Sequence, residues 1–380
     1  MPAHDSGTPA PFDPARYRRQ ITLTGAAAQK KLAEAHVAVI GAGGLGSPAL
    51  LYLAGAGVGR ITLIDDDVVD LSNLHRQVIH TTERIGTPKV DSAVDAVHAL
   101  NPDVQVVPVR QRLTWENALE VFEGVDVIMD GADNFDTRHI ASHAAARLGV
   151  PHVWGSVLGY ESQLSVFWAG HGPVYEDLFP TPPAPGVVPS CAQAGVLGPV
   201  VGVTGSAMAM EALKLIMGVG EPLVGTLGYY DSLSGRWEYI PVAADPAVAK
   251  RVLHDEPPQQ RSPLAAFDAV EEVDEIPAGA VVIDVREPEE FELFHIPGAV
   301  NVPLGEILGG FTPEVIAQAQ ETGAESGADS GAEPSAPPLV VVQCAGGVRS
   351  ATAVDALQRR GATGLVSLRG GIDAWQKKQV

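Results

Sequence analysis

The two cysteines of this 380-residue chain, Cys191 and Cys344, both stand where a thiol could act as a nucleophile. Cys191 follows a proline-rich loop and precedes an apolar helix, whose dipole favours a thiolate at its N-terminus. Cys344 ends a predicted strand and opens the loop CAGGVRS, in which Ser350 is the expected N-cap of the next helix. Successive N–H groups of such a loop can converge on a sulfur anion, and Arg349 adds a fixed positive charge. A lone cysteine is often only a small buried residue, so the surrounding motifs must decide between these interpretations.

A glycine-rich turn, GAGGLG (41–46), lies between a predicted strand and a predicted helix. Backbone N–H groups at a helix N-terminus bind phosphate when glycines allow the ligand to approach closely. The glycines expected at this site are Gly41, Gly43 and Gly44. Asp65, at the tip of the following strand, is placed to accept hydrogen bonds from a ribose. The pattern predicts a nucleotide site and leaves an NAD-dependent oxidoreductase open as one interpretation.

Charged residues beyond the second strand favour a triphosphate over a nicotinamide. Asn73, Arg76 and Lys89 follow that strand. Fixed cations neutralise the negative charge that develops when a phosphate is attacked, whereas a nicotinamide ring needs an apolar pocket. Asp133 follows the next predicted strand and is a natural ligand for Mg²⁺. Because these residues follow successive strands, we expect ATP and Mg²⁺ at one edge of the sheet.

Short runs of β-branched residues alternate with helical patterns from residue 36 onward. This order is typical of βαβ units, which form a parallel sheet covered by helices on both faces. The predicted strands are 36–40, 60–65, 125–130 and 152–157. The fold class is therefore α/β, with a doubly wound, mostly parallel, Rossmann-like sheet in the first part of the chain.

Changes in composition divide the chain into two domains. Residues 243–262 lose apolar periodicity and indicate a linker between an N-terminal domain, 1–242, and a smaller α/β domain, 263–380. Within the second domain, residues 312–338 are rich in Ala, Gly, Ser and Pro, with five acidic and no basic side chains. Such a segment cannot bury enough surface to order itself, so we expect a disordered insertion.

The net charge of −21, from 25 basic and 46 acidic residues, argues against binding to nucleic acid or to an anionic membrane. The longest uncharged stretch, 194–210, is broken by Gly, Pro, Ser and Thr and favours a buried helix over a membrane span. No secretory signal is visible, so a cytoplasmic protein is expected. Two cysteines are too few for a disulfide framework or a cysteine-only zinc site.

The first domain resembles the ubiquitin-activating-like adenylyltransferases of the MoeB/ThiF family. The motifs that carry the resemblance, in family order, are RYRRQITL (16–23), GAGGLG (41–46), SNLHRQ (72–77), Lys89, the Asp133-Asn134 pair, SCAQAGV (190–196) and MAMEALKLIMG (208–218). The resemblance implies that ATP and magnesium are held by Gly44, Asp65, Ser72, Asn73, Leu74, His75, Arg76, Lys89, Asp133 and Asn134. It also implies that Arg19 reaches the phosphates in the other subunit of a homodimer, and that Cys191 bonds to the activated acyl group.

One family feature is missing, because members usually carry two C-x-x-C pairs that bind zinc. The segment that would hold the first pair is PVYED (173–177), where Val174 and Asp177 cannot supply thiolates. No cysteine follows the last strand of the domain until Cys344. We therefore predict no structural zinc.

The second domain resembles a rhodanese domain. Its motifs, in rhodanese order, are VVIDVREPEEF (281–291), HIPGAVNVPL (295–304), CAGGVRS (344–350) and LRGGIDAW (368–375). A cysteine phosphatase needs five residues between its cysteine and arginine, and only four separate Cys344 from Arg349, so the loop suits a sulfur atom better. Asp284 and Arg286 are expected to form a structural ion pair, and His295 to make a structural hydrogen bond.

Together these features predict an enzyme that uses ATP to adenylate the C-terminal glycine of a small ubiquitin-like sulfur carrier of the MoaD/ThiS type. A persulfide, loaded by a donor such as a cysteine desulfurase, would then form a carrier thiocarboxylate for molybdopterin, thiamine or thiolated tRNA synthesis. The expected catalytic residues are Arg76, Lys89, Asp133, Cys191, Cys344 and Arg349. The order in which the two cysteines attack stays open. The alternatives are a tRNA-modifying dehydratase, a non-catalytic rhodanese docking module and the NAD oxidoreductase.

Overall fold

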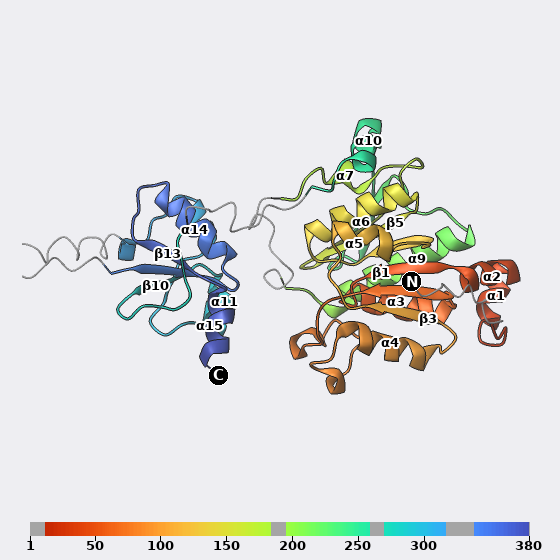
Figure 1. The fold of residues 1–380 in the computed structure, drawn as a ribbon, viewed down its shortest axis with the longest axis horizontal. Coiled ribbons are helices and arrows are strands. Elements are labelled where there is room, and N and C mark those ends of the chain that lie inside the picture. Colours follow the sequence, from red (N-terminus) through yellow and green to blue (C-terminus); the bar gives the residue numbers. More distant parts are fainter. Residues whose placement is uncertain (1–11, 184–194, 259–269, 317–337, 380) are drawn as a thin grey trace, which may run out of the picture. The chain divides into compact units, whose positions relative to one another are not determined.

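The computed structural model describes residues 12–183, 195–258, 270–316 and 338–379. The chain separates into two compact units (Figure 1). Unit 1 comprises residues 1–182 and 189–259, and unit 2 comprises residues 183–188 and 260–380. Each unit has its own sheet and is described by itself.

Unit 1 contains an eight-stranded sheet with the order β3-β2-β1-β4-β5-β6-β7-β8. Its strands are β1 (His36–Ile40), β2 (Arg60–Ile64), β3 (Gln105–Val109), β4 (Val127–Asp130), β5 (His152–Leu158), β6 (Glu161–Phe167), β7 (Thr226–Asp231) and β8 (Arg236–Pro241). The strands from β3 to β5 pair in parallel, and β6, β7 and β8 extend the sheet antiparallel. The predicted parallel strands are confirmed, whereas the antiparallel extension did not emerge from the βαβ pattern.

Helices cover both faces of this sheet, as a doubly wound fold requires. They are α1 (Arg18–Thr24), α2 (Ala26–Glu34), α3 (Gly46–Ala56), α4 (Lys89–Leu100), α5 (Trp115–Val121), α6 (Phe135–Leu148), α7 (Tyr175–Leu178), α9 (Gly198–Met217) and α10 (Pro246–His254), with short 3₁₀ turns η1 (Leu71–Asn73) and η2 (Thr82–Arg84). Alternate residues of β1 enter opposite cores: Val37 and Val39 pack with α3 and α9, and Ala38 and Ile40 with α5 and α6. In Figure 1, α5 and α6 lie on one side of the sheet and α4 on the other.

Helix α9 is long and apolar enough to cross a membrane, but half of its most apolar stretch is buried inside the protein. Met208, Ala209 and Ala212 belong to the same core as β1. Gly205 brings α9 so close to the start of α3 that a Cβ atom there would lie 2.3 Å from the Leu45 carbonyl oxygen. The helix is therefore a core element, which confirms the prediction of a buried helix.

The predicted linker, 243–262, begins too early. Its first part forms α10, whose N-cap Asp245 accepts a hydrogen bond from the Ala247 N–H. Val252 is 2% exposed and packs with Val174 in unit 1. The helix is short, so one buried valine was too weak a periodic signal, although an aspartate before a proline is typical of a helix start.

Unit 2 contains a five-stranded parallel sheet with the order β11-β10-β12-β13-β9. Its elements are β9 (Glu272–Val273), β10 (Val281–Asp284), α11 (Pro288–Leu293), β11 (Val300–Asn301), α12 (Leu304–Leu308), β12 (Val340–Gln343), α14 (Val348–Gln358), β13 (Leu365–Leu368) and α15 (Gly371–Gln379). The predicted insertion, 312–338, falls mostly outside the described residues. Of its first residues, Ile316 is 1% exposed in the core.

Candidate active sites

A pocket of about 400 Å³ opens at the carboxyl ends of the parallel strands in unit 1. We call it the strand-end pocket. The predicted site residues that line it are Gly41, Gly43, Gly44, Asp65, Arg76, Lys89, Asp133 and Asn134. The glycines, Asp65, Asp133 and Asn134 lie just after β1, β2 and β4, and Arg76 and Lys89 come from the longer segment after β2 and the start of α4. The pocket includes the point where the strand order reverses, which is where open α/β sheets bind ligands.

The glycine turn forms the floor of the strand-end pocket and leads directly into α3. Gly41 has a φ of +89°, which L side chains rarely adopt. Gly46, the first residue of α3, lies so close to this turn that a Cβ atom would be 1.8 Å from the Gly41 carbonyl oxygen. Only glycine fits at this position. Within the turn, the Gly41 and Ala42 N–H groups donate to the Ile64 carbonyl oxygen and the Asp65 carboxylate, so the N–H groups after Ala42 are the candidates for binding phosphate.

Replacing Gly46 by alanine is expected to lower the free energy of unfolding by about 3 kcal/mol, because the methyl group overlaps the backbone of Gly41. Nucleotide affinity is expected to fall as the turn is displaced. Urea unfolding and calorimetric ATP titration measure the two effects. Gly55→Ala is the matched control in the same helix, because a Cβ atom there meets nothing within 4 Å. Equal behaviour of the two variants would show that the turn tolerates the added methyl group.

Asp65 is held in place by backbone hydrogen bonds. One carboxylate oxygen accepts the Ala42 N–H at 2.8 Å and the other accepts the Asp67 N–H at 2.9 Å. Burial raises the pKa of Asp65, and the nearby Lys89 charge and these hydrogen bonds oppose that rise. His80, which the sequence analysis did not single out, supports the turn from behind, with Nε2 2.9 Å from the Ala42 carbonyl oxygen.

The two predicted cations of the strand-end pocket have different partners. Lys89 begins α4, and its Nζ donates to an Asp67 carboxylate oxygen at 2.8 Å, with 7% of its side chain exposed. The Arg76 guanidinium donates to the Ser72 carbonyl oxygen at 3.1 Å and lies 2.8 Å from the His75 ring. Among the described residues, Arg76 thus has only neutral partners and presents an uncompensated charge to the pocket.

Several residues predicted from the family resemblance lie outside the lining of the strand-end pocket. They are Ser72, Asn73, Leu74 and His75, in η1 and the turn after it, and Arg19 in α1. Asp70 orders η1 by accepting hydrogen bonds from the Ser72 N–H and hydroxyl. Arg19 lines a separate cavity of about 290 Å³ beside α3. The roles of all five residues toward a nucleotide stay predictions. Arg19 in particular was expected to act on the nucleotide of the other subunit.

Asp133 and Asn134 follow β4, and their side chains do different things in the structure. The Asn134 side chain accepts the Thr137 N–H at 2.9 Å and caps α6. Asp133 is exposed and lines the strand-end pocket. The described residues hold no group of three or more acidic, His or Cys side chains suited to a metal ion. A single carboxylate fits Mg²⁺, which commonly takes one or two carboxylates together with substrate phosphates.

At the segment where the family resemblance predicts a C-x-x-C pair, this chain forms the short helix α7. The Val174 N–H donates to the Asp177 carboxylate at 2.8 Å. Glu176 is buried and joins α7 to α6 through His139 at 2.8 Å and the Ser142 hydroxyl at 2.7 Å. These contacts connect the two helices through protein side chains alone, and the absence of zinc stays a prediction.

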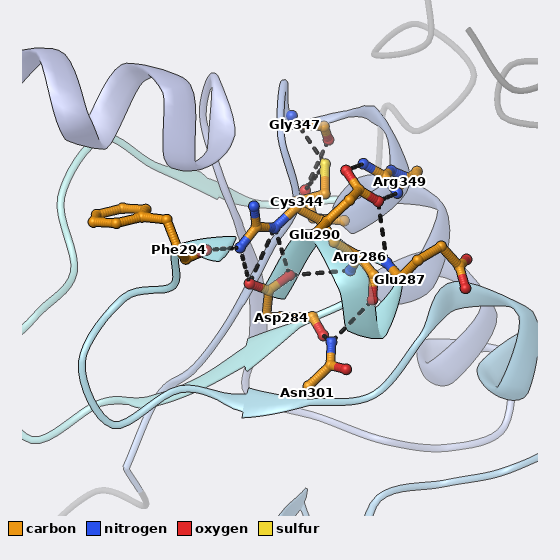
Figure 2. A network of polar contacts seen from close by, with 10 residues as sticks. Asp284, Arg286, Glu287, Glu290, Phe294, Asn301, Cys344, Gly347 and Arg349 are labelled. Carbon is orange, nitrogen blue, oxygen red and sulfur yellow. Dashed lines mark hydrogen bonds and ion pairs between the residues drawn. The ribbon is translucent and has the colours of Figure 1, made fainter. Parts of the chain in front are cut away.

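The second site is the cysteine loop, residues 344–350, which joins β12 to α14 in unit 2 (Figure 2). Cys344 is 1% exposed, and its Sγ atom accepts the Gly347 N–H at 3.1 Å. The predicted N-cap, Ser350, is wrong: Gly347 caps α14 with a φ of +94°, because glycine lets the chain enter the helix three residues earlier. Ser350 is therefore buried in the first turn, 3.6 Å from Cys344 Sγ.

Arg349 closes the cysteine loop, but its charge is paired. Figure 2 shows its guanidinium facing Glu290 of α11, with hydrogen bonds of 2.7 and 2.8 Å to the two carboxylate oxygens. Burial by itself would raise the pKa of Glu290, but the hydrogen bonds from Arg349 and from the Glu287 N–H, with the Arg349 charge, lower this pKa from its usual value. Among the described contacts, the Gly347 N–H and the Ser350 hydroxyl, rather than a free cation, therefore face Cys344 Sγ.

Two structural predictions for unit 2 are consistent with the contacts. Asp284 and Arg286 form a buried ion pair at 2.6 Å, and Arg286 also donates to the Phe294 carbonyl oxygen at 2.7 Å (Figure 2). The His295 Nδ1 atom lies 3.0 Å from the Phe291 carbonyl oxygen. Both interactions brace α11, which presents Glu290 to Arg349.

Glu290→Gln is expected to lower the stability of unit 2 by about 2 kcal/mol at neutral pH, because it removes a charged partner from Arg349. The Glu290 pKa is lowered in the folded state, so its stabilisation is present above pH 4.5 and is lost as the pH falls further. Urea-dependent hydrogen-exchange mass spectrometry of peptides from 344–358 measures the stability of unit 2 at neutral pH and at about pH 3. The exposed neighbour Glu289→Gln is the control. A difference between variant and wild type that persists undiminished at about pH 3 would contradict this assignment.

Cys191 lies outside the described residues, so its predicted role as an acyl acceptor rests on the sequence. The pocket also contains residues that the sequence analysis did not assign, among them Arg138 and Ser156. Arg138 stands in the segment DGADNFDTR, 130–138, which was noted for Asp133. The available signal was an arginine one turn into the helix that follows a strand-end aspartate. The spacing of these residues in the sequence does not predict that the arginine side chain is buried.

Comparison with known proteins gives a family match for each part of the chain. The model of the ThiF family matches residues 17–250, and that of the rhodanese-like domain matches residues 269–378. The chain is 42% identical over 383 residues to "Probable adenylyltransferase/sulfurtransferase MoeZ" of Mycobacterium tuberculosis, covering 96% of this chain and 93% of that protein. It is 35% identical over 389 residues to "Adenylyltransferase and sulfurtransferase MOCS3" of Arabidopsis thaliana, covering 95% and 82%.

One further comparison concerns the sequence of the first unit, and another concerns the fold. "Sulfur carrier protein adenylyltransferase" of Thermus thermophilus is 46% identical over 252 residues, which is 64% of this chain and 92% of that protein. The crystal structure of E. coli MccB with ATP superposes with a TM-score of 0.55 at 21% identity, over 63% of this chain and 74% of that one. At this identity, the structural likeness supports the fold alone.

Proposed function

Since this chain belongs to the ThiF family and ends in a rhodanese-like domain, we propose that it activates a small ubiquitin-like sulfur carrier and then transfers sulfur to it. The chain is an adenylyltransferase and sulfurtransferase, and the proposal concerns its substrate and product. The substrate is the C-terminal glycine of the carrier, and the product is its thiocarboxylate. The observation that carries the proposal is a strand-end pocket lined by Lys89 and by the uncompensated Arg76 in one unit, and a buried cysteine that accepts a backbone hydrogen bond in the other.

In the first reaction, a carboxylate oxygen of the carrier attacks the α-phosphorus of ATP, and the bond to pyrophosphate breaks. Asp65 is placed to bind the ribose, and the N–H groups of the glycine turn approach the phosphates. Lys89 and Arg76 offset the negative charge that gathers on the α-phosphoryl group. Asp133 would hold Mg²⁺, which supplies further charge neutralisation when bound.

In the second reaction, the terminal sulfur of a Cys344 persulfide attacks the carbonyl carbon of the acyl adenylate, and AMP leaves. A carboxylate is a poor electrophile, so the first reaction provides the leaving group that the second one needs. Cys191 either forms an acyl intermediate or attacks Cys344 Sγ in the acyl disulfide, which releases the thiocarboxylate and leaves a disulfide. The Gly347 N–H, 3.1 Å from Cys344 Sγ, supports the anionic sulfur during transfer.

The proposal also names a sulfur donor, the pathways that the carrier serves, the cellular compartment and the oligomeric state. A cysteine desulfurase is a suitable donor, because it delivers sulfur at the oxidation level of a persulfide. The carrier would serve molybdopterin, thiamine or thiolated tRNA synthesis, and the enzyme would act as a cytoplasmic homodimer. The relatives named above as adenylyltransferase and sulfurtransferase support the two activities.

Carrier-dependent ATP–pyrophosphate exchange tests the first reaction, and mass spectrometry of the carrier tests the second. We expect exchange only when the carrier has a free C-terminal carboxylate. With a persulfide donor, the carrier mass should rise by the difference between sulfur and oxygen. Calorimetry should show binding of ATP but not of NADH. Exchange without any carrier, or the absence of a mass change with a loaded Cys344, would contradict the proposal.

A further inference from the structure

Arg138, in the second half of the strand-end pocket, is a buried arginine held by neutral groups. It belongs to α6, and the residue is 8% exposed. Its guanidinium donates to the Ala132 carbonyl oxygen at 3.2 and 3.0 Å and to the Ser156 hydroxyl at 3.2 Å. The guanidinium also lies 5.1 Å from the centre of the Phe135 ring and 5.7 Å from that of Trp154. These contacts fix its orientation tightly.

The other two buried arginines of the described chain each have a carboxylate partner. Arg286 pairs with Asp284 at 2.6 Å, and Arg349 pairs with Glu290 at 2.7 Å. None of the ion pairs among the described residues involves Arg138. The nearest buried acid on the strand before it, Asp130, is instead bonded to the His152 ring and the Ala132 N–H. Burying an unpaired charge is costly, so such a charge indicates that a ligand supplies the anion.

The position of Arg138 separates it from the cations assigned to the phosphates. Lys89 and Arg76 follow β2, at one end of the strand-end pocket. Arg138 lines the other end, with Ser156 of β5, beyond the point where the strand order reverses. The reaction proposed above must bring two anions together, ATP and a carboxylate, so it needs positive charge at both ends of the pocket.

We propose that Arg138 is the receptor for the terminal carboxylate of the acyl substrate. This rests on the proposed function and names a binding group for its substrate. The rigid guanidinium orients the carboxylate and offsets its repulsion by the phosphates, so that one oxygen faces the α-phosphorus. When the new oxygen–phosphorus bond forms and pyrophosphate leaves, the carboxylate charge is lost, so the arginine acts mainly in substrate binding.

A double-mutant cycle between enzyme and substrate tests this assignment. The probe is a small ubiquitin-like sulfur carrier ending in glycine, prepared with its free carboxylate and as the C-terminal carboxamide. Calorimetry in the presence of a non-hydrolysable ATP analogue measures the affinity of both probes for wild type and for Arg138→Gln. Wild type is expected to favour the carboxylate by about 10- to 100-fold, and the variant to bind both probes about equally.

Two variants control for folding and for general charge. Arg147→Gln, on the same helix but outside the pocket lining, should retain the wild-type preference. Arg138→Lys keeps the charge without the planar guanidinium, and we expect it to recover part of the preference. Arg138→Gln also loses the hydrogen bonds to Ala132 and Ser156, so the melting temperature of each variant without carrier is measured alongside, and affinities are compared at a temperature where both are folded.

Each outcome decides the assignment. An Arg138→Gln variant that still distinguishes the two probes as wild type does would overturn it. A loss of ATP affinity with retained discrimination would assign Arg138 to a phosphate instead. An equal loss of affinity for both probes would show a structural role only. If wild type shows no carrier-dependent exchange, the proposed function fails, whereas exchange with unchanged discrimination sinks only the assignment of Arg138.

Discussion

Replacing Cys344 by alanine is expected to lower thiocarboxylate formation by at least about 10³-fold, because the sulfur that carries the persulfide is removed. Carrier-dependent ATP–pyrophosphate exchange should continue, since all the residues assigned to the phosphates belong to unit 1. The substitution also removes the Sγ atom that accepts the Gly347 N–H, so the melting temperature of the variant is measured alongside. The measurement is exchange together with mass spectrometry of the carrier.

Cys191→Ala provides the paired comparison for this experiment, because these are the only two cysteines in the chain. Exchange is expected to survive this substitution as well. If both reactions stop in the Cys344 variant while its melting temperature is unchanged, the proposed division of labour between the two units is wrong. Thiocarboxylate formation in that variant at the wild-type rate would remove Cys344 from the sulfur transfer.

Lys89→Met is expected to slow carrier-dependent exchange by about 10²- to 10³-fold, because it deletes a fixed cation from the strand-end pocket. Methionine retains an apolar stem that can fill the buried space of the lysine side chain. The partner Asp67 has 70% of its side chain exposed, so water can solvate it after the ion pair is lost. The effect should therefore concern the reaction more than the fold.

Initial exchange rates at saturating carrier, with melting temperatures alongside, measure this effect. Lys30→Met is the matched control, since Lys30 is 71% exposed on α2 and pairs only with Glu34 at 3.7 Å among the described residues. It should exchange like wild type. An exchange rate close to wild type in Lys89→Met would exclude Lys89 from charge stabilisation at the α-phosphoryl group.

The parts of the fold that could be predicted depend on local patterns. The run HVAVI is buried throughout β1, and its position between a helix and a glycine turn is visible within a few residues. The same holds for the Cys344 strand and loop. The antiparallel strands β6, β7 and β8 were missed. The pairing of β6 with β7, as between Leu164 and Gly228, joins segments far apart in the chain, whereas the β5–β6 and β7–β8 hairpins are local and their short turns were not recognised. The short helix α10 was missed because a single buried side chain, Val252, anchors it.

The sequence by itself determined the α/β class, the glycine turn beside Asp65 and the loop that holds Cys344. These features depend on hydrophobic periodicity and on turn residues that are neighbours in the chain. Only the tertiary structure decided which charges are paired: Arg349 meets Glu290 from 59 residues away, whereas Arg138 meets no described carboxylate. The physical reason is that the cost of a buried charge depends on distances between side chains that come together only after folding, and no local pattern encodes those distances.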